Sequence, residues 1–187
     1  MGQQGSRESI ARLVTRYRVS INWLFGLVYL FFARPTYKSL LLAAIIVGCG
    51  EGLRVWASGH INKSSRLANG GPYAFTRHPL YLGSFIIGLG FCLAGRSWWL
   101  TGAFVLLFPL IYGTTMKAEE RKLRELFPDE YQAYARKVHL FFPLGKGYKG
   151  RGGGFQWKLF LENREHKTLV GVAAVFALLL LKIAIMR

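Results

Sequence analysis

Long apolar stretches constrain this chain more than any other feature of its sequence. Five of them are candidates for membrane spans, and the segments that connect them are polar and mostly basic. The last stretch has the length that a helix needs to cross about 30 Å of hydrocarbon, whereas the first and third are short by that measure. A soluble domain of 187 residues cannot bury five such helices in its core, so we predict an all-α integral membrane bundle of about five transmembrane helices. The five stretches are 19–33, 39–57, 80–95, 98–116 and 168–186.

The basic residues fall mainly on one side of these predicted spans. The chain carries 25 Lys and Arg against 9 Asp and Glu, a formal net charge of +16. If the N-terminus is cytoplasmic, 20 of the 25 basic residues lie on the cytoplasmic side, which is the bias expected of cytoplasmic loops. Topology and attraction to anionic lipid head groups therefore account for most of the charge. We expect an integral membrane protein with a cytoplasmic N-terminus, anionic lipids as partners and no nucleic acid.

Two long cytoplasmic segments, 54–79 and 117–167, hold the residues that could carry chemistry, because the outer connections are short turns. After Pro143 the run GKGYKGRGGG predicts a flexible linker, and the next residues predict an amphipathic, interfacial lead into the last span. We predict four units: two transmembrane helices in 1–57, a central unit with the candidate site in 58–143, a basic linker and interfacial segment in 144–167, and a transmembrane helix in 168–187.

The fourth span is expected to continue into water as a helix that Pro128 ends. Pro128 also suits the first turn of a new helix, whose next two residues are acids in the position that the helix dipole favours. In that helix Tyr131, Tyr134 and Val138 recur at i, i+3 and i+7, which predicts one buried stripe.

The first candidate site motif is NGGPYAFTRHPLYLG, directly before the third span. Its Gly-Gly-Pro run predicts a tight turn, and the later proline suits the first turn of the span. This arrangement brings polar side chains to the mouth of a helix whose unpaired N–H groups can bind an anionic ligand. The alternative is an anchor at the membrane interface, where aromatic and basic residues are common. The side chains concerned are Tyr73, Arg77, His78 and Tyr81.

The second motif is the acidic pair Glu119 and Glu120, at the point where the fourth span leaves the bilayer. Consecutive helical residues point about 100° apart, so only one of the two acids is expected to face the bundle. The alternative for Glu120 is a place on the helix surface, paired with Arg124 at i+4, and this surface role is the one we favour.

A further acid, Glu51, lies inside the second stretch. Intramembrane acids are functional candidates, but Arg54 at i+3 is expected to neutralise this one. The glycines of GCGEG around Glu51 favour close helix packing over a nucleotide loop, because no strand precedes them. The four histidines have no metal-ligand spacing, so we expect no metal site.

Taken together, the motifs resemble a known family. LRVWASGHINKSSRLANGGPYAFTRHPLYLG, an apolar hairpin, and then EERKLRELFPDEYQAYARKVHLFFP are similar to the isoprenylcysteine carboxyl methyltransferase family and to related membrane methyltransferases that act on phospholipid amines. The resemblance covers residues 53–143 and rests on the GPY turn, RHPxY, the EExxL helix, the FxxxYxxY stripe and a closing proline. It identifies 58–143 as a methyltransferase core.

The resemblance implies a membrane methyltransferase that uses S-adenosyl-L-methionine, bound from the cytoplasmic side, while a lipid or prenylated substrate enters from the bilayer. Two positions depart from the family: Thr115 stands where an arginine contacts the prenylcysteine, and Ser65 stands where the family can have histidine. The implied cofactor contacts are Ser65, Arg66, Leu67, Ala68, Tyr73, His78, Pro79, Leu80, Tyr81 and Glu119.

The candidate catalytic residues are Arg77 and Glu120. A carboxylate acceptor needs only desolvation and a nearby cation, whereas an amine acceptor needs a base, for which Glu120 or Glu119 is the candidate. Arg77 and His78 can hold the carboxylate of the cofactor, and Glu119 its ammonium group.

Two other classes of protein remain open. A membrane reductase of the sterol-reductase type shares an RHPxY-like motif and the YxxY stripe but uses NADPH. A non-catalytic membrane protein would use its basic loops only to bind anionic lipids.

Overall fold

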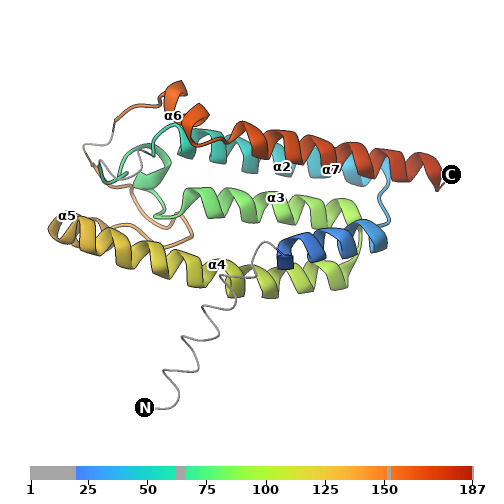
Figure 1. Ribbon diagram of the computed structural model, residues 1–187, viewed down its shortest axis with the longest axis horizontal. Coiled ribbons are helices and arrows are strands. Elements are labelled where there is room, and N and C mark those ends of the chain that lie inside the picture. The colour runs from blue at the N-terminus through green and yellow to red at the C-terminus, as the bar shows by residue number, and fades with distance from the viewer. Residues whose placement is uncertain (1–19, 62–65, 151–152, 187) are drawn as a thin grey trace, which may run out of the picture.

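The computed structural model describes residues 20–61, 66–150 and 153–186 (Figure 1). These residues form helices and contain no β-strand, which confirms the predicted all-α class. The first helix is described over Ser20–Phe32. The others are α2 (Tyr37–Ser58), the 3₁₀ helix η1 (Gly71–Ala74), α3 (Pro79–Gly95), α4 (Trp98–Leu126), α5 (Pro128–Ala135), α6 (Trp157–Glu162) and α7 (His166–Ile185).

The long helices lie side by side along the molecule, and α5 and α6 sit at the end opposite the C-terminus (Figure 1). By length and composition α2, α4 and α7 can cross a membrane. The first helix and α3 are apolar but shorter, as the short first and third stretches predicted. Over the described residues, three of the five predicted spans therefore have the length of a membrane span.

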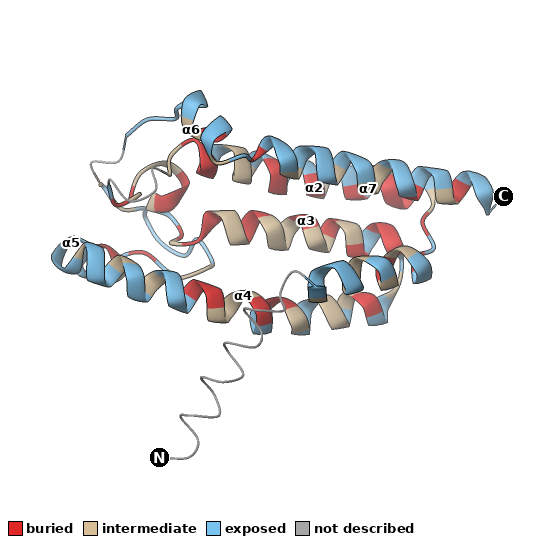
Figure 2. Ribbon diagram, viewed as in Figure 1, coloured by how far each residue is buried: buried red, intermediate tan, exposed pale blue. Residues whose placement is uncertain are grey.

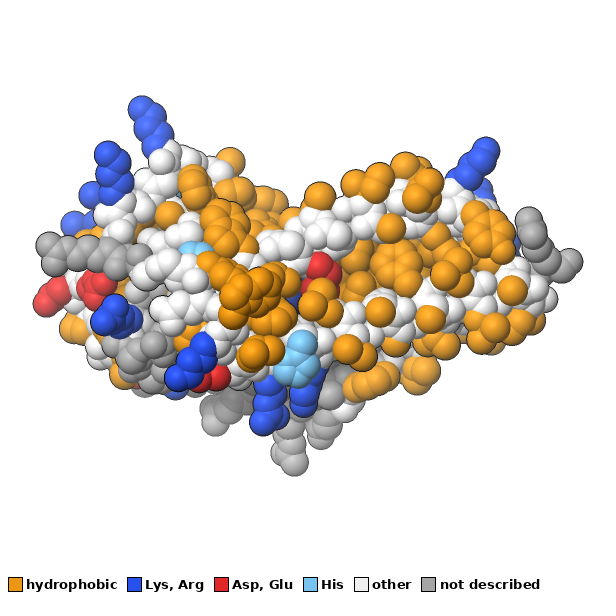
Figure 3. Space-filling view, turned by 90° about the horizontal axis from the view of Figure 1, so that it is seen from above, with side chains coloured by type: hydrophobic (Ala, Val, Ile, Leu, Met, Phe, Trp, Pro, Cys, Tyr) orange, Lys and Arg blue, Asp and Glu red, His pale blue; other side chains and the backbone are white. Residues whose placement is uncertain are grey.

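The outer surface of the bundle is apolar. Large side chains such as Leu41, Leu106 and Val170 are exposed, and α7 is exposed along most of its length (Figure 2). In Figure 3 apolar side chains cover much of the part of the bundle built from the long helices. Most of the Lys and Arg side chains in this view lie toward the end of the molecule with α5 and α6. An apolar surface of this extent is what lipid tails would cover.

Glycines set the close contact between α2 and α3. A Cβ on Gly50 would lie 2.8 Å from the carbonyl oxygen of Gly83, and one on Gly90 would lie 2.6 Å from a methyl group of Val47. Such contacts are possible only without a side chain, so these residues let the two backbones approach. Within GCGEG the helix-packing role is thereby confirmed for Gly50, whereas a Cβ on Gly48 or Gly52 would meet nothing within 4 Å.

The ion pair of Arg54 corrects one prediction. Its Nη2 atom lies 2.7 Å from the Glu165 carboxylate, just before α7, and Nη1 donates to the Leu80 carbonyl at 3.2 Å. Arg54 thus joins α2 to α3 and α7, and its ion-pair partner is Glu165 rather than Glu51. Among the described residues the Oε1 atom of buried Glu51 has no hydrogen-bond partner. A long side chain reaches acids far away in the sequence as easily as those on its own helix.

The helix break at Pro128 is confirmed. The fourth helix ends at Leu126 and α5 begins at Pro128. Tyr131, Tyr134 and Val138 are buried and share one cluster with Leu67, so the predicted stripe is confirmed.

The described residues 144–150, which follow Pro143, have no regular secondary structure but are packed against the fold. The Tyr148 N–H donates to the Ala74 carbonyl at 2.8 Å, and the Tyr148 ring lies 5.4 Å from that of Tyr134. A Cβ on Gly150 would meet Asn69 at 2.5 Å. This part of the run is therefore packed against the fold through Tyr148, and the predicted flexibility of the linker stays a prediction.

Candidate active site

The turn before α3 depends on a glycine. Gly71 has a φ of +56°, and a Cβ there would lie 2.5 Å from Nε2 of His60. Pro72 follows in the first turn of η1, and the Tyr73 N–H donates to the Gly70 carbonyl at 3.1 Å. The predicted tight turn is present, and it directs the chain toward the start of α3.

A short backbone bridge then fixes the RHPxY motif. The Arg77 N–H donates to the His139 carbonyl at 3.0 Å, and the Thr76 hydroxyl donates to the Phe141 carbonyl at 2.7 Å. The loop before α3 is therefore tied to the segment after α5. Because α5 folds back on α4, this tie also brings the motif to the acidic pair.

Glu120 lies inside this junction. It forms an ion pair with Arg77, and its Oε1 atom also accepts a hydrogen bond from the Tyr131 hydroxyl at 2.7 Å. The Arg77 and Glu120 side chains are only 14% and 12% exposed. The favoured surface role of Glu120 is thus wrong, and its predicted partner Arg124 instead lies 6.0 Å from the centre of the Tyr131 ring. The partners of Glu120 come from α5 and from the loop before α3, and the residue spacing within α4 gave no sign of either.

Glu119 is the more exposed acid of the pair. Its side chain is 50% exposed, and its Oε1 atom accepts a hydrogen bond from the Tyr81 hydroxyl at 2.6 Å. The Oε2 atom lies 3.7 Å from Nδ1 of His78. Both acids contact the start of α3, so the prediction that only one of them faces the bundle is wrong, and the two differ instead in exposure, 50% for Glu119 against 12% for Glu120. The half-exposed carboxylate is the one that a ligand from solution can reach.

His78 lies between the two acids. Its side chain is 5% exposed, and Nε2 is 4.0 Å from Glu120. Burial lowers the pKa of His78 to about 4, Glu120 opposes this shift, and Arg77 adds to it. The imidazole is therefore neutral at pH 7 and can donate one hydrogen bond, but it is not a cation. Among the described residues Nε2 has no hydrogen-bond partner.

Three tyrosines, Tyr73, Tyr131 and Tyr134, lie next to this polar cluster. The Tyr134 hydroxyl donates to the Tyr73 carbonyl at 2.7 Å, and the buried Tyr73 hydroxyl has no partner within the part of the chain that is described. Burial is the main cause that raises the pKa of Tyr73. Burial, and then Glu120, raise the pKa of Tyr131 to about 12. The hydroxyls of Tyr73 and Tyr131 stay protonated at neutral pH, and those of Tyr131 and Tyr134 act as hydrogen-bond donors.

The structure gathers part of the predicted site. Arg77, His78, Tyr81, Glu119 and Glu120 form one cluster. The other predicted residues lie around it or apart from it. Tyr73 and Leu67 are buried beneath the cluster, Pro79 and Leu80 begin α3, Arg66 is exposed, Ala68 is half-buried, and Ser65 lies outside the described residues.

Sequence reasoning missed the Tyr131 hydroxyl as a partner of Glu120. The YxxY spacing indicated a buried stripe, but a stripe only shows that the ring is inside. A buried tyrosine needs an acceptor for its hydroxyl, and this requirement was the available signal.

These observations define the class: an apolar helical bundle whose RHPxY and EE motifs meet in a polar cluster at the start of α3. Residues 51–130 match the phospholipid methyltransferase family. The resemblance to isoprenylcysteine carboxyl methyltransferases and related phospholipid methyltransferases is thereby confirmed, and the matches support a membrane methyltransferase.

Three relatives illustrate the similarity. The cobalt-zinc-cadmium resistance protein CzcN of Cupriavidus metallidurans is 29% identical over 159 residues, which are 78% of this chain and 73% of the relative. The nickel-cobalt-cadmium resistance protein NccN of Alcaligenes xylosoxydans xylosoxydans is 36% identical over 92 residues, 48% of this chain and 43% of the relative. The protein-S-isoprenylcysteine O-methyltransferase of Schizosaccharomyces pombe is 34% identical over 110 residues, 56% of this chain and 44% of the relative. No solved structure matches the chain significantly.

Proposed function

We propose that this protein transfers a methyl group from S-adenosyl-L-methionine to a lipid or lipidated acceptor in the membrane. The observation that carries the proposal is the contact between the RHPxY and EE motifs, made by the Tyr81–Glu119 hydrogen bond and the neighbouring His78. This contact lies within the part of the chain that matches the phospholipid methyltransferase family.

The residues of the cluster suit the amino-acid portion of this cofactor. Glu119 is half exposed and offers a carboxylate for an ammonium group. The N–H groups of Leu80 and Tyr81, in the first turn of α3, are donors for a carboxylate. His78 Nε2 and the Tyr73 hydroxyl are buried polar atoms without a partner in the described part of the chain, so they remain available to a ligand.

When bound, the cofactor would supply a sulfonium methyl group, which the acceptor would attack in line while S-adenosylhomocysteine leaves as the neutral thioether. The protein's contribution is alignment and the exclusion of water. The Tyr81 ring lies 5.7 Å from the ring of His78 and 5.4 Å from that of Tyr112. This aromatic wall offers cation–π stabilisation to a positive charge beside it.

We propose an ordering role for the pair Arg77 and Glu120. The Glu120 carboxylate already accepts from Arg77 and from the Tyr131 hydroxyl before any substrate enters. The pair thereby holds the loop of the RHPxY motif against α4, and its charges lie beside the reacting groups.

The methyl acceptor belongs to one of two classes, the isoprenylcysteine carboxylates or the phospholipid amines. Thr115, which replaces the family's substrate-binding arginine, is buried, and its hydroxyl donates to the Ile111 carbonyl at 3.3 Å. It offers no cation to a prenylcysteine carboxylate. Among the described residues, no three His, Cys, Asp or Glu side chains cluster so that they could hold a metal ion.

The test is ligand binding by the purified full chain in detergent. S-adenosylhomocysteine should raise the temperature of unfolding in a concentration-dependent manner, whereas NADPH should not. Stabilisation by NADPH alone would show a reductase, and stabilisation by neither ligand would show a non-catalytic protein. Transfer of a labelled methyl group into lipid extracts and into prenylcysteine analogues then identifies the acceptor.

A further inference from the structure

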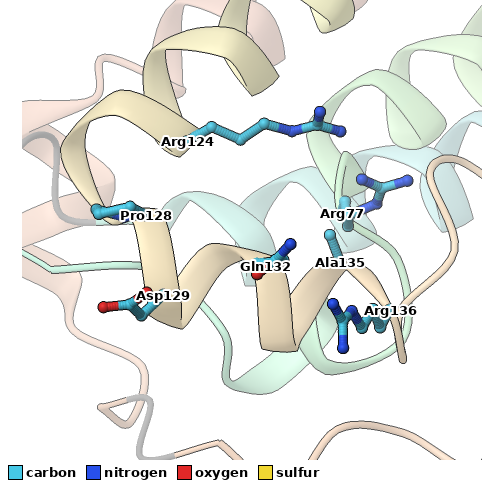
Figure 4. A pocket seen from close by; sticks show the side chains of 7 residues that line it. All are labelled: Arg77, Arg124, Pro128, Asp129, Gln132, Ala135 and Arg136. Atoms are coloured by element: carbon cyan, nitrogen blue, oxygen red, sulfur yellow. The ribbon is translucent and has the colours of Figure 1, made fainter.

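A polar cavity that is open to the surface lies beside the cluster, on the side of α5. It has a volume of about 580 Å³, and three arginines line it, together with Pro128, Asp129 and Gln132 (Figure 4). The arginines come from three separate elements: Arg77 from the loop before α3, Arg124 from the last turn of α4, and Arg136 from the residue that follows α5. The fold thus directs three positive charges at one cavity.

These charges are only partly balanced. Arg77 is paired with Glu120, whereas Arg124 and Arg136 form no ion pair with any described residue. Asp129 is the only acid among the residues that line the cavity. In Figure 4 its carboxylate points away from the three guanidinium groups. Like charges around a common cavity are held together more easily when an anion lies between them.

The cavity does not suit the methyl donor. S-adenosyl-L-methionine carries a sulfonium, an ammonium and a carboxylate, so its net charge is positive, and a cavity lined by arginines repels it. His78, Tyr81 and Glu119, which we assign to the donor, do not line the cavity. Arg77 is the lining residue that connects the two sites, because it pairs with Glu120 of the cluster.

We propose that this cavity is a binding site for a phosphate-bearing anion. A guanidinium group presents parallel N–H donors that match two oxygens of a phosphate, and the three groups here surround a space large enough for a phosphorylated head group. The ligand is either the head group of an anionic lipid or a soluble phosphate. The cavity lies at the polar end of α4, where both can reach it. The assignment does not depend on methyl transfer.

The experiment measures binding to the full chain without any activity readout. In detergent, inorganic pyrophosphate is titrated and binding is followed by calorimetry. In a second arm the chain is placed in phosphatidylcholine nanodiscs with and without phosphatidic acid, and the unfolding temperature is compared. Binding in the first arm identifies a soluble phosphate, and stabilisation only by phosphatidic acid identifies a lipid head group.

Variants connect the binding to the cavity. Arg124→Gln and Arg136→Gln should each weaken it about fivefold, the effect of one basic residue near an anionic surface. Arg121→Gln is the matched control, because this exposed residue of α4 carries the same charge but does not line the cavity. Asp129→Asn should strengthen binding, since it removes the one acid of the lining. Equal losses in all three arginine variants would show diffuse charge attraction and overturn the proposal. Failure of both phosphate probes to bind would also overturn it.

Discussion

The buried ion pair between Arg77 and Glu120 makes a sharp prediction about stability. Glu120→Gln keeps the size of the side chain and an oxygen that can accept from the Tyr131 hydroxyl, but it removes the negative charge. Arg77, only 14% exposed, would then keep its charge without a counter-ion. We expect the variant to fold and to be less stable than the wild type.

The expected size follows from the burial of the pair. Removing one partner of a fully buried ion pair costs about 3–5 kcal/mol. Here both side chains retain a little exposure and the glutamine keeps one hydrogen bond, so we expect a loss of about 2 kcal/mol in the free energy of unfolding. Equilibrium unfolding of the purified protein in mild detergent measures it.

Glu125→Gln is the matched control, because Glu125 lies on the same helix, is exposed and has no ion pair with another described residue. It should change the stability by less than about 0.5 kcal/mol. Arg77→Gln combined with Glu120→Gln should cost clearly less than the sum of the single changes, since the two residues contact each other. Strict additivity, or an effect of Glu120→Gln no larger than that of Glu125→Gln, would refute the ion pair.

Three further predictions concern pH, packing and topology. Burial lowers the pKa of His78 to about 4 from its ordinary 6.5, so the unfolded chain takes up the proton first. The free energy of unfolding should therefore fall by about 3 kcal/mol as the pH drops from 6.5 to 4, because over that range the unfolded chain binds the proton and the folded chain does not. His78→Gln should flatten that part of the stability curve, and an unchanged slope would contradict a buried neutral imidazole. Gly50→Ala should cost about 1–3 kcal/mol because its Cβ would strike the backbone of α3, whereas Gly52→Ala, with open space around it, should be nearly neutral; equal effects would argue against the close contact. A reporter fused after Lys149 should lie in the cytoplasm and one after Arg187 on the opposite side, as the asymmetry of basic residues requires; a cytoplasmic signal from both would exclude the predicted topology.

The positions of the helices along the chain could be predicted because they depend on residues that are close together in the sequence. Runs of apolar residues locate the membrane helices, Pro128 ends one helix and begins another, and the glycines at 50 and 83 indicate close packing. Each of these signals is contained in a few neighbouring residues. The packing of the Tyr148 segment could not be read in this way, because its partners Ala74 and Tyr134 are distant in the sequence.

The partners of charged side chains depend on the whole fold. Arg54 was matched with the nearest acid, but it pairs with Glu165, 111 residues away. Within α4 the spacing favoured Arg124 for Glu120, whereas the actual partners come from the loop before α3 and from α5. A helical pattern shows that two adjacent acids diverge, but it does not show which one the folded neighbours will cover.

The central claim is that the RHPxY and EE motifs together bind the methyl donor, and the affinity of Glu119→Gln for S-adenosylhomocysteine tests it most directly. If Glu119 holds the ammonium group, the change removes a charge-assisted contact worth about 1.5–3 kcal/mol and should weaken binding about 10- to 100-fold. Glu125→Gln should bind as the wild type does. An unchanged affinity in Glu119→Gln, or no binding of S-adenosylhomocysteine by the wild-type protein, would contradict the account.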